Sequence, residues 1–318
     1  MYYAVTHLTV YKYSDHVSDS VMQVRLQPRS DQSQRQVRFD LQISPAVKVQ
    51  SHRDYLGNAI HTFDVPAPHR RLAIKSDAVV EVRECPEVPQ SLPVSTWELL
   101  DRDNYDRDCY DMLMTGHYTE PTSLLMQFAH EIDWRRRDDP LSLLRELNAV
   151  IYNSFDYQQH VTKVDSPIDI ALENRLGVCQ DFAHIMIALT RQIGIPCRYV
   201  SGYLFHREDQ LDRSDVDASH AWVEAWLPQL GWIGFDPTNN LMVGDRHIRV
   251  SIGSDYTEAA PTRGVFKGTA ETKLEVRVQV SRLDELPDDS AELAPEIVMP
   301  HYEVQSQSQM QMQMQQQQ

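Results

Sequence analysis

Residues 175–184 of the chain read Arg175-Leu176-Gly177-Val178-Cys179-Gln180-Asp181-Phe182-Ala183-His184. Gly177 stands two residues before the cysteine and allows a sharp turn where side chains would collide. A thiol in the first turn of a helix lies beside unpaired backbone N–H groups and the positive end of the helix dipole. Both favour the thiolate, so Cys179 is a candidate nucleophile. The helix itself is predicted by one apolar face at spacings of three and four, formed by Phe182, Ile185, Met186, Leu189 and Ile193.

Two downstream segments offer this thiol a base and a carboxylate. Residues 219–226 alternate between two faces as a strand does, and a short turn separates them from a second strand at 232–236. Read as an antiparallel hairpin, the two strands bring His220 beside Asp236. A carboxylate holds an imidazole through one ring N–H and leaves the other nitrogen facing the thiol. Cys179, His220 and Asp236 therefore fit the roles of nucleophile, base and orienting group.

With these residues in place, the sequence resembles the bacterial transglutaminase-like superfamily. The resemblance implies an α+β fold with a papain-like core, in which helices pack on an antiparallel sheet. It also implies a catalytic triad of Cys179, His220 and Asp236. The motifs that carry the resemblance are GVCQDFAH at 177–184, GIPCRYVSGY at 194–203, His220-Ala221-Trp222 and Asp236-Pro237-Thr238.

The resemblance extends beyond the core. Tyr11-Lys12-Tyr13, LQPR at 26–29 and DYLGN at 54–58 are similar to the all-β N-terminal domain that precedes the core in one bacterial branch. Residues 252–256 and 261–265 are similar to the C-terminal segment of that branch. We expect a β-rich N-terminal domain at 1–90, a catalytic domain at 91–285 and a disordered Gln/Met-rich tail at 286–318.

Local patterns agree with this division. Alternation over residues 3–11, turn residues at 54–58 and an apolar run at 78–82 predict an N-terminal sheet. Apolar stripes at 124–132 and 143–151 predict two helices before the one that begins at Cys179. Further strands are expected at about 195–206 and 273–283. The last strand either joins the core sheet or returns to the N-terminal domain.

Composition limits the partners. The formal net charge of −16 argues against nucleic acid, because phosphate binding needs clustered Lys and Arg. The sequence shows neither a secretion signal nor an apolar run near the ~20 residues that span a bilayer. Its four cysteines are scattered, with no CxxC pair, which is typical of a reducing compartment. We expect a cytoplasmic protein with a peptide or protein substrate, and leave its oligomeric state open.

Other roles for the site residues are weaker. A zinc site assembled from Cys179, His184, His220 and Asp236 has no short-spaced ligand pair, so no metal and no cofactor are predicted. His184 lies more than a third of a turn away from Cys179 on the same helix and fits a packing role better than the role of base.

Acyl transfer also requires an oxyanion hole. The backbone N–H of Cys179 is the natural first donor. Tyr157 and Gln180 are candidates for the second, and a packing role for Tyr157 is an equal alternative.

The implied reaction is cysteine-dependent acyl transfer through a thioester. Hydrolysis of a peptide or amide bond is favoured, because the bacterial branch that the chain resembles is usually described as cysteine proteases. Two alternatives stay open. One is protein-glutamine transglutaminase activity, since the same triad serves water or an amine as acceptor. The other is a non-enzymatic binding module retaining the fold, in which a triad member would be missing or misplaced.

Overall fold

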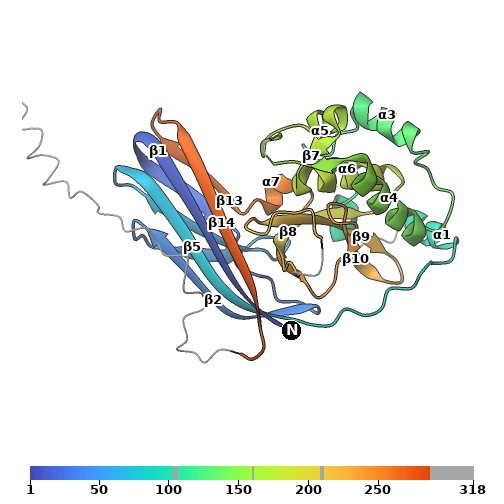
Figure 1. Ribbon diagram of the computed structural model, residues 1–318, viewed down its shortest axis with the longest axis horizontal. Coiled ribbons are helices and arrows are strands. Elements are labelled where there is room, and N and C mark those ends of the chain that lie inside the picture. Colours follow the sequence, from blue (N-terminus) through green and yellow to red (C-terminus); the bar gives the residue numbers. More distant parts are fainter. Residues whose placement is uncertain (103–106, 160, 208–210, 287–318) are drawn as a thin grey trace, which may run out of the picture.

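The computed structural model describes residues 1–102, 107–159, 161–207 and 211–286 of the 318-residue chain. Within this part, a seven-stranded sheet and a five-stranded sheet account for all strands except a two-stranded pair. Figure 1 shows the long strands of the larger sheet at one end of the molecule and helices α3 to α6 at the other. Among the described residues, no helix combines the length and apolar character needed to cross a bilayer.

The larger sheet is built around β1 (Tyr2–Val24), whose 23 residues bind four partner strands. The first half of β1 pairs with β5 and β14, and the second half pairs with β4 and β13. The turn predicted at 54–58 is confirmed, because it joins β3 to its antiparallel partner β4, and its Gly57 has a φ of +78°. The other strands of this sheet are β2 (Gln34–Ser44), β3 (Gln50–Arg53), β4 (Ala59–Val65), β5 (His69–Val82), β13 (Thr262–Lys267) and β14 (Thr272–Leu283).

The position of β14 resolves the alternative that the sequence left open. Its residues pair with β1 from Tyr2–Leu283 to Tyr13–Thr272, so the chain returns to the N-terminal sheet after completing the core. The expected catalytic range of 91–285 remains a prediction, and its last two strands hydrogen-bond to the N-terminal sheet. Within the tail expected at 286–318, residues 287–318 lie outside the described part of the chain.

The smaller sheet is antiparallel, in the order β11-β10-β9-β8-β12. Helix α6 (Cys179–Gln192) packs on it, and apolar side chains from α6 meet Ala221, Val223 and Ala225 of β9 in one core. This confirms the α+β class with helices on an antiparallel sheet. The strands are β8 (Cys197–Leu204), β9 (His220–Leu227), β10 (Gly231–Asp236), β11 (Leu241–Met242) and β12 (His247–Gly253), and β6 (Asp156–Tyr157) pairs separately with β7 (Leu176–Gly177).

The predicted helical stripes are helices α3 (Ser123–Glu131) and α4 (Pro140–Ser154). Four short helices escaped prediction because none exceeds seven residues, too few to show two full turns of an apolar period. They are α1 (Thr96–Asp101), α2 (Arg107–Asp111), α5 (Ile168–Asn174) and α7 (Tyr256–Ala259).

Side chains of the N-terminal domain cover the outer edge of β12, which ends the smaller sheet. The Gln34 amide accepts from Arg249 N at 2.8 Å and donates to Arg249 O at 2.8 Å. Asn58 does the same at Ile252, with distances of 2.9 Å and 2.8 Å. Each amide thus forms hydrogen bonds with the backbone N–H and C=O groups that would otherwise pair with a further strand. The two sheets are fixed to each other by hydrogen bonds of defined register.

A buried ion network lies beside the same strand. The Glu224 carboxylate, 1% exposed, contacts Arg198 and Arg249 at 2.7 Å each, and Arg249 reaches Asp31 of the N-terminal domain at 2.6 Å. Burial alone would raise the pKa of Glu224, but the charges of Arg249 and Arg198 outweigh it and lower the pKa. The carboxylate is therefore ionised, and removing either arginine would leave a buried charge short of a partner.

We expect Gly202→Ala to destabilise the protein by about 2 kcal/mol. A Cβ at this position would lie 2.1 Å from the Ile248 carbonyl oxygen and 2.6 Å from the Trp222 ring. Gly202 pairs with His220 of β9 and with Arg249 of β12. The strands that carry the Trp222 ring and the Ile248 carbonyl therefore cannot withdraw without breaking the sheet. Urea denaturation measures the change. Gly244→Ala is the matched control, because a Cβ there meets nothing within 4 Å; equal losses in the two variants would contradict the argument.

Candidate active site

Cys179 begins α6, and the turn before it is held by one carboxylate. Asp181 Oδ2 accepts from Val178 N at 2.8 Å and from Thr162 Oγ1 at 2.6 Å. This satisfies a backbone donor at the helix start, as expected of an acid in the first turn. Gly177 is required by this approach, because a Cβ there would lie 2.9 Å from Asp181 Oδ2. The glycine thus permits the close contact that fixes the turn two residues before the cysteine.

His220 and Asp236 meet as the hairpin predicted. His220 is the first residue of β9 and Asp236 the last of β10, and the strands pair in the register Phe235–Val223. His220 Nε2 lies 2.8 Å from Asp236 Oδ2. Both side chains are almost wholly buried. The other ring nitrogen, Nδ1, is buried without a hydrogen-bond partner and is left for the thiol, and Cys179 is among the groups that raise the pKa of His220.

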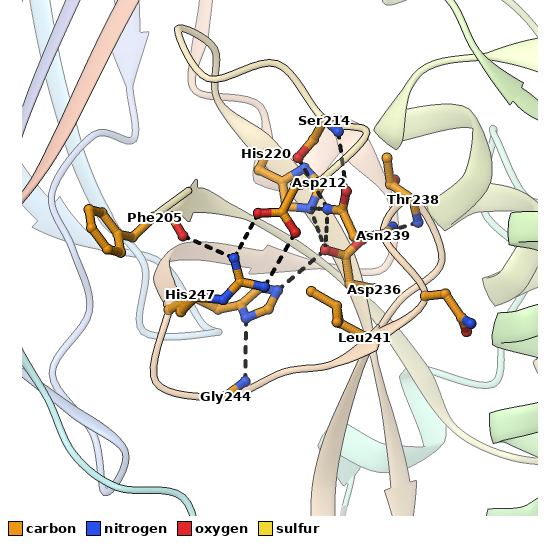
Figure 2. Close-up of polar contacts among 12 residues, drawn as sticks. Phe205, Asp212, Ser214, His220, Asp236, Thr238, Asn239, Leu241, Gly244 and His247 are labelled. Atoms are coloured by element: carbon orange, nitrogen blue, oxygen red, sulfur yellow. Dashed lines mark hydrogen bonds and ion pairs between the residues drawn. The ribbon is translucent and has the colours of Figure 1, made fainter. Parts of the chain in front are cut away.

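Two residues that the sequence did not single out also bind the Asp236 carboxylate. Figure 2 shows Asn239 and His247 converging with His220 on this group, with Asn239 Nδ2 at 2.8 Å and His247 Nε2 at 3.3 Å from Oδ2. Oδ1 accepts from the backbone N–H groups of Thr238 and Asn239, at 3.1 Å and 3.3 Å. A histidine opening a strand eleven residues after Asp236 was the available signal for His247, but many surface strands begin in this way.

The electrostatics of the pair follow from its geometry. Burial acts to lower the pKa of His220, but the charge and hydrogen bond of Asp236, followed by Cys179, raise it to about 10. Burial acts to raise the pKa of Asp236, but His220 and His247 hold it well below its usual range. At neutral pH the site therefore holds a buried imidazolium–carboxylate pair.

The two candidate oxyanion donors have different surroundings. Tyr157 lies in β6 opposite Gly177 of β7, next to the turn that carries Cys179. Burial, and after it the charge of Cys179, raises the pKa of Tyr157, so its hydroxyl is protonated. Gln180 instead donates its amide to Val164 O at 2.9 Å. That bond engages the side chain in holding the loop before α5.

His184 faces away from the thiol, as its position on the helix indicated. Its ring stacks between Tyr118 and Tyr199, with centroid distances of 4.9 Å and 5.0 Å, and its Nε2 accepts from Tyr256 N at 3.2 Å. Burial lowers its pKa to about 3, so it is neutral. His184 is a packing residue, and the four-ligand zinc set that would include it is not assembled.

One described cluster has the composition of a metal site. One ligand atom each from His220, Asp236 and His247 lies within 4.8 Å of the others. The Asn239 amide nitrogen occupies the approach, however, at 2.8 Å from Asp236 Oδ2 and 3.5 Å from His220 Nε2. Both imidazoles direct an N–H at the carboxylate, so the ligand atoms already have hydrogen-bond partners. The arrangement fits a hydrogen-bonded carboxylate better than a metal ion.

Comparisons with known proteins agree with the fold. The family model of the transglutaminase-like superfamily matches residues 127–237, and that of the bacterial transglutaminase-like N-terminal region matches residues 3–81. An uncharacterised protein of Mycobacterium leprae is 33% identical over 284 residues, 88% of this chain and 98% of the relative. The crystal structure of a candidate cysteine protease from Cytophaga hutchinsonii superposes with a TM-score of 0.68 at 22% identity, covering 90% of this chain and 93% of the other.

A shorter match concerns the core alone. The protein-glutamine gamma-glutamyltransferase of Pseudomonas aeruginosa is 40% identical over 81 residues, 24% of this chain and 12% of the relative.

We expect Asp236→Asn to cost about 3 kcal/mol or more at pH 6 and less as the pH rises. The folded pKa of His220, about 10, lies above its unfolded value of ~6.5. The stabilisation is therefore complete below ~6.5 and is lost as pH rises through about 10. The lowered pKa of Asp236 gives the opposite limb, with stabilisation above ~4 that is lost in acid.

Urea denaturation of the wild type and the variant between pH 5 and 10 measures this difference, and any constant packing penalty cancels from its slope. A difference that stays unchanged across this range would show that the pair is not ionised.

Proposed function

Because the chain belongs to the transglutaminase-like superfamily, we propose that it is a cysteine-dependent acyl-transfer enzyme whose triad is Cys179, His220 and Asp236. The observation that carries the proposal is the position of the His220 ring. One nitrogen is bound to a buried carboxylate, the other is buried with no hydrogen-bond partner, and Cys179 is among the groups that raise the pKa of the ring. This is the relation of nucleophile, base and orienting group that acyl transfer requires.

In the proposed reaction, the proton of the Cys179 thiol has already passed to His220, so that a thiolate faces the imidazolium. The thiolate attacks the carbonyl carbon of a peptide or amide, and a tetrahedral oxyanion forms. The protonated His220 then gives its proton to the leaving amine as the C–N bond breaks, which leaves a thioester on Cys179. Water, deprotonated by His220, attacks the thioester and releases the acid and the thiol. Asp236 stays ionised throughout and balances the charge of the imidazolium.

The oxyanion needs at least one donor besides the backbone N–H of Cys179. Tyr157 is the better supported of the two candidates, because its hydroxyl is protonated and the charge of Cys179 acts on it. Gln180 has its amide bound to Val164. We therefore assign the second donor to Tyr157.

Hydrolysis is the primary proposal and transfer to an amine the second candidate. The similarity over 81 residues to a protein-glutamine gamma-glutamyltransferase supports transfer to an amine as the second candidate. Both reactions share every step up to the thioester, and they differ in which nucleophile reaches it. The complete set of three residues counts against a non-enzymatic binding module.

The proposed setting is the reducing cytoplasm, where a catalytic thiol stays unpaired. None of the four cysteines forms a disulfide, which supports this setting.

We expect an iodoacetamide-type electrophile to label the wild type at Cys179 near neutral pH and to label Cys179→Ala at least 100-fold more slowly. His220→Ala should slow labelling and reduce any turnover by about 10³-fold or more, because the thiol loses its base. Mass spectrometry of the labelled peptides measures both effects.

Cys85→Ala is the matched control. Cys85 is also half-buried and free, but burial raises its pKa, so its removal should leave labelling unchanged. Equal labelling of the wild type and Cys179→Ala would remove the basis of the proposal.

A peptide library incubated with the enzyme, with and without an excess of a primary amine, separates hydrolysis from transfer. We expect shortened peptides in both samples, since water resolves the thioester. Mass spectrometry would instead show glutamine residues carrying the amine, with loss of ammonia, if transfer were the main reaction. The Cys179→Ala protein, treated in parallel, corrects for background cleavage.

A further inference from the structure

His247 is a buried histidine with no part in the reaction as written above. It opens β12, pairs opposite Leu204 of β8, and has a side chain only about 2% exposed. The Trp222 ring packs edge-on against it at 5.2 Å, and the His220 ring lies 6.4 Å away. The backbone of β12 is fixed from outside by Gln34 and Asn58 of the N-terminal domain. The strand thus has little freedom to move the imidazole.

The hydrogen bonds of His247 determine where its proton lies. Gly244 N donates to Nδ1 at 3.3 Å, so Nδ1 is the acceptor nitrogen. The proton is therefore on Nε2, which lies 3.3 Å from Asp236 Oδ2 and donates to it. Burial lowers the pKa of His247, and the charge of His220 lowers it further, although Asp236 acts against both. His247 is accordingly a neutral N–H donor.

We propose that His247 is a positioning residue for the triad: its neutral Nε2–H holds Asp236 Oδ2 toward His220 and draws off part of the carboxylate charge. Two consequences follow. The carboxylate cannot rotate away from His220, because three N–H groups on Oδ2 and two on Oδ1 fix both oxygens. Its attraction for the His220 proton is also weaker than that of an unshared carboxylate, which leaves the imidazolium able to give up its proton during turnover.

The surroundings of His220 limit what else could cause such an effect. The titratable groups that face it are Asp236 from β10, Cys179 from α6, His247 from β12 and His206 just after β8. His206 acts on it only through charge, and burial lowers the pKa of His206. Asn239 also donates to Asp236 but does not titrate. A substitution at Asn239 would also disturb the turn after β10. A substitution at His247 removes a donor to Asp236 Oδ2 and leaves that turn intact.

The test compares His247→Leu, which removes the donor and keeps bulk, with His247→Gln, which keeps an N–H donor that cannot titrate as a histidine. NMR of ring-nitrogen-labelled protein follows the titration of His220. We expect its pKa to be higher in the Leu variant than in the Gln variant by about 0.5–1 unit, with the Gln variant near the wild type. In turnover assays, kcat of the Leu variant should fall by about tenfold with KM little changed.

A merely structural role would lower the amount of folded protein without moving this titration. Equal His220 titrations in the Leu and Gln variants would therefore overturn the proposal. The wild type gives a check that needs no variant. Its His247 ring nitrogens should report the neutral Nε2–H form at neutral pH, and a charged or Nδ1–H ring there would contradict the assignment.

The proposal rests on the proposed function, but its NMR readout does not need turnover. If Cys179 proved inert, the His220 titration would still decide the role of His247 toward Asp236. Zinc titration of the wild type supplies the remaining outcome. Stoichiometric binding that abolishes the His220 titration would make the cluster a metal site and would also overturn the proposal.

Discussion

The buried carboxylate of Asp236 is the group on which the arrangement of the site depends. An unpaired charge at this depth would cost several kcal/mol, so the fold must bring donors to it. They come from three places: the start of β9, the start of β12 and the turn after β10. The five-stranded sheet is thus ordered around one anion. The position of His220, and through it the environment of the Cys179 thiol, follows from satisfying that charge.

The N-terminal sheet and its loops also help to fix the five-stranded sheet, through contacts at its outer strand. Their side-chain amides complete the edge of β12, and Asp31 completes the ion network of Glu224 through Arg249. An apolar cluster joins Tyr3, Val5 and Val80 of the large sheet to Ile248 and Val250 of β12. Because β12 carries His247, these contacts fix the position of a strand that contributes to the candidate site. The N-terminal sheet thus supports the smaller sheet at a strand that binds the Asp236 carboxylate.

Much of this could be predicted from the sequence, because the signals were local. The helix at Cys179 and the hairpin bearing His220 and Asp236 follow from period, glycine and turn residues within about 60 positions, and the α+β class was implied by the family resemblance that these motifs carry. His247 and the return of β14 to β1 could not be derived in the same way. Their partners are fixed by tertiary pairing, in which Tyr2 meets Leu283 and Gln34 meets Arg249, and no local pattern specifies such distant contacts. Asn239 likewise gave no signal apart from its place in a turn.

The central claim is that Cys179 forms a thioester with a carbonyl substrate. Acid quenching shortly after mixing with an activated ester, followed by intact-protein mass spectrometry, tests it directly. We expect one acyl group per chain, which peptide mapping locates on Cys179 and hydroxylamine removes. The amount of acylated protein should be strongly reduced in His220→Ala. An unmodified protein, or an acyl group on any other residue, would contradict it.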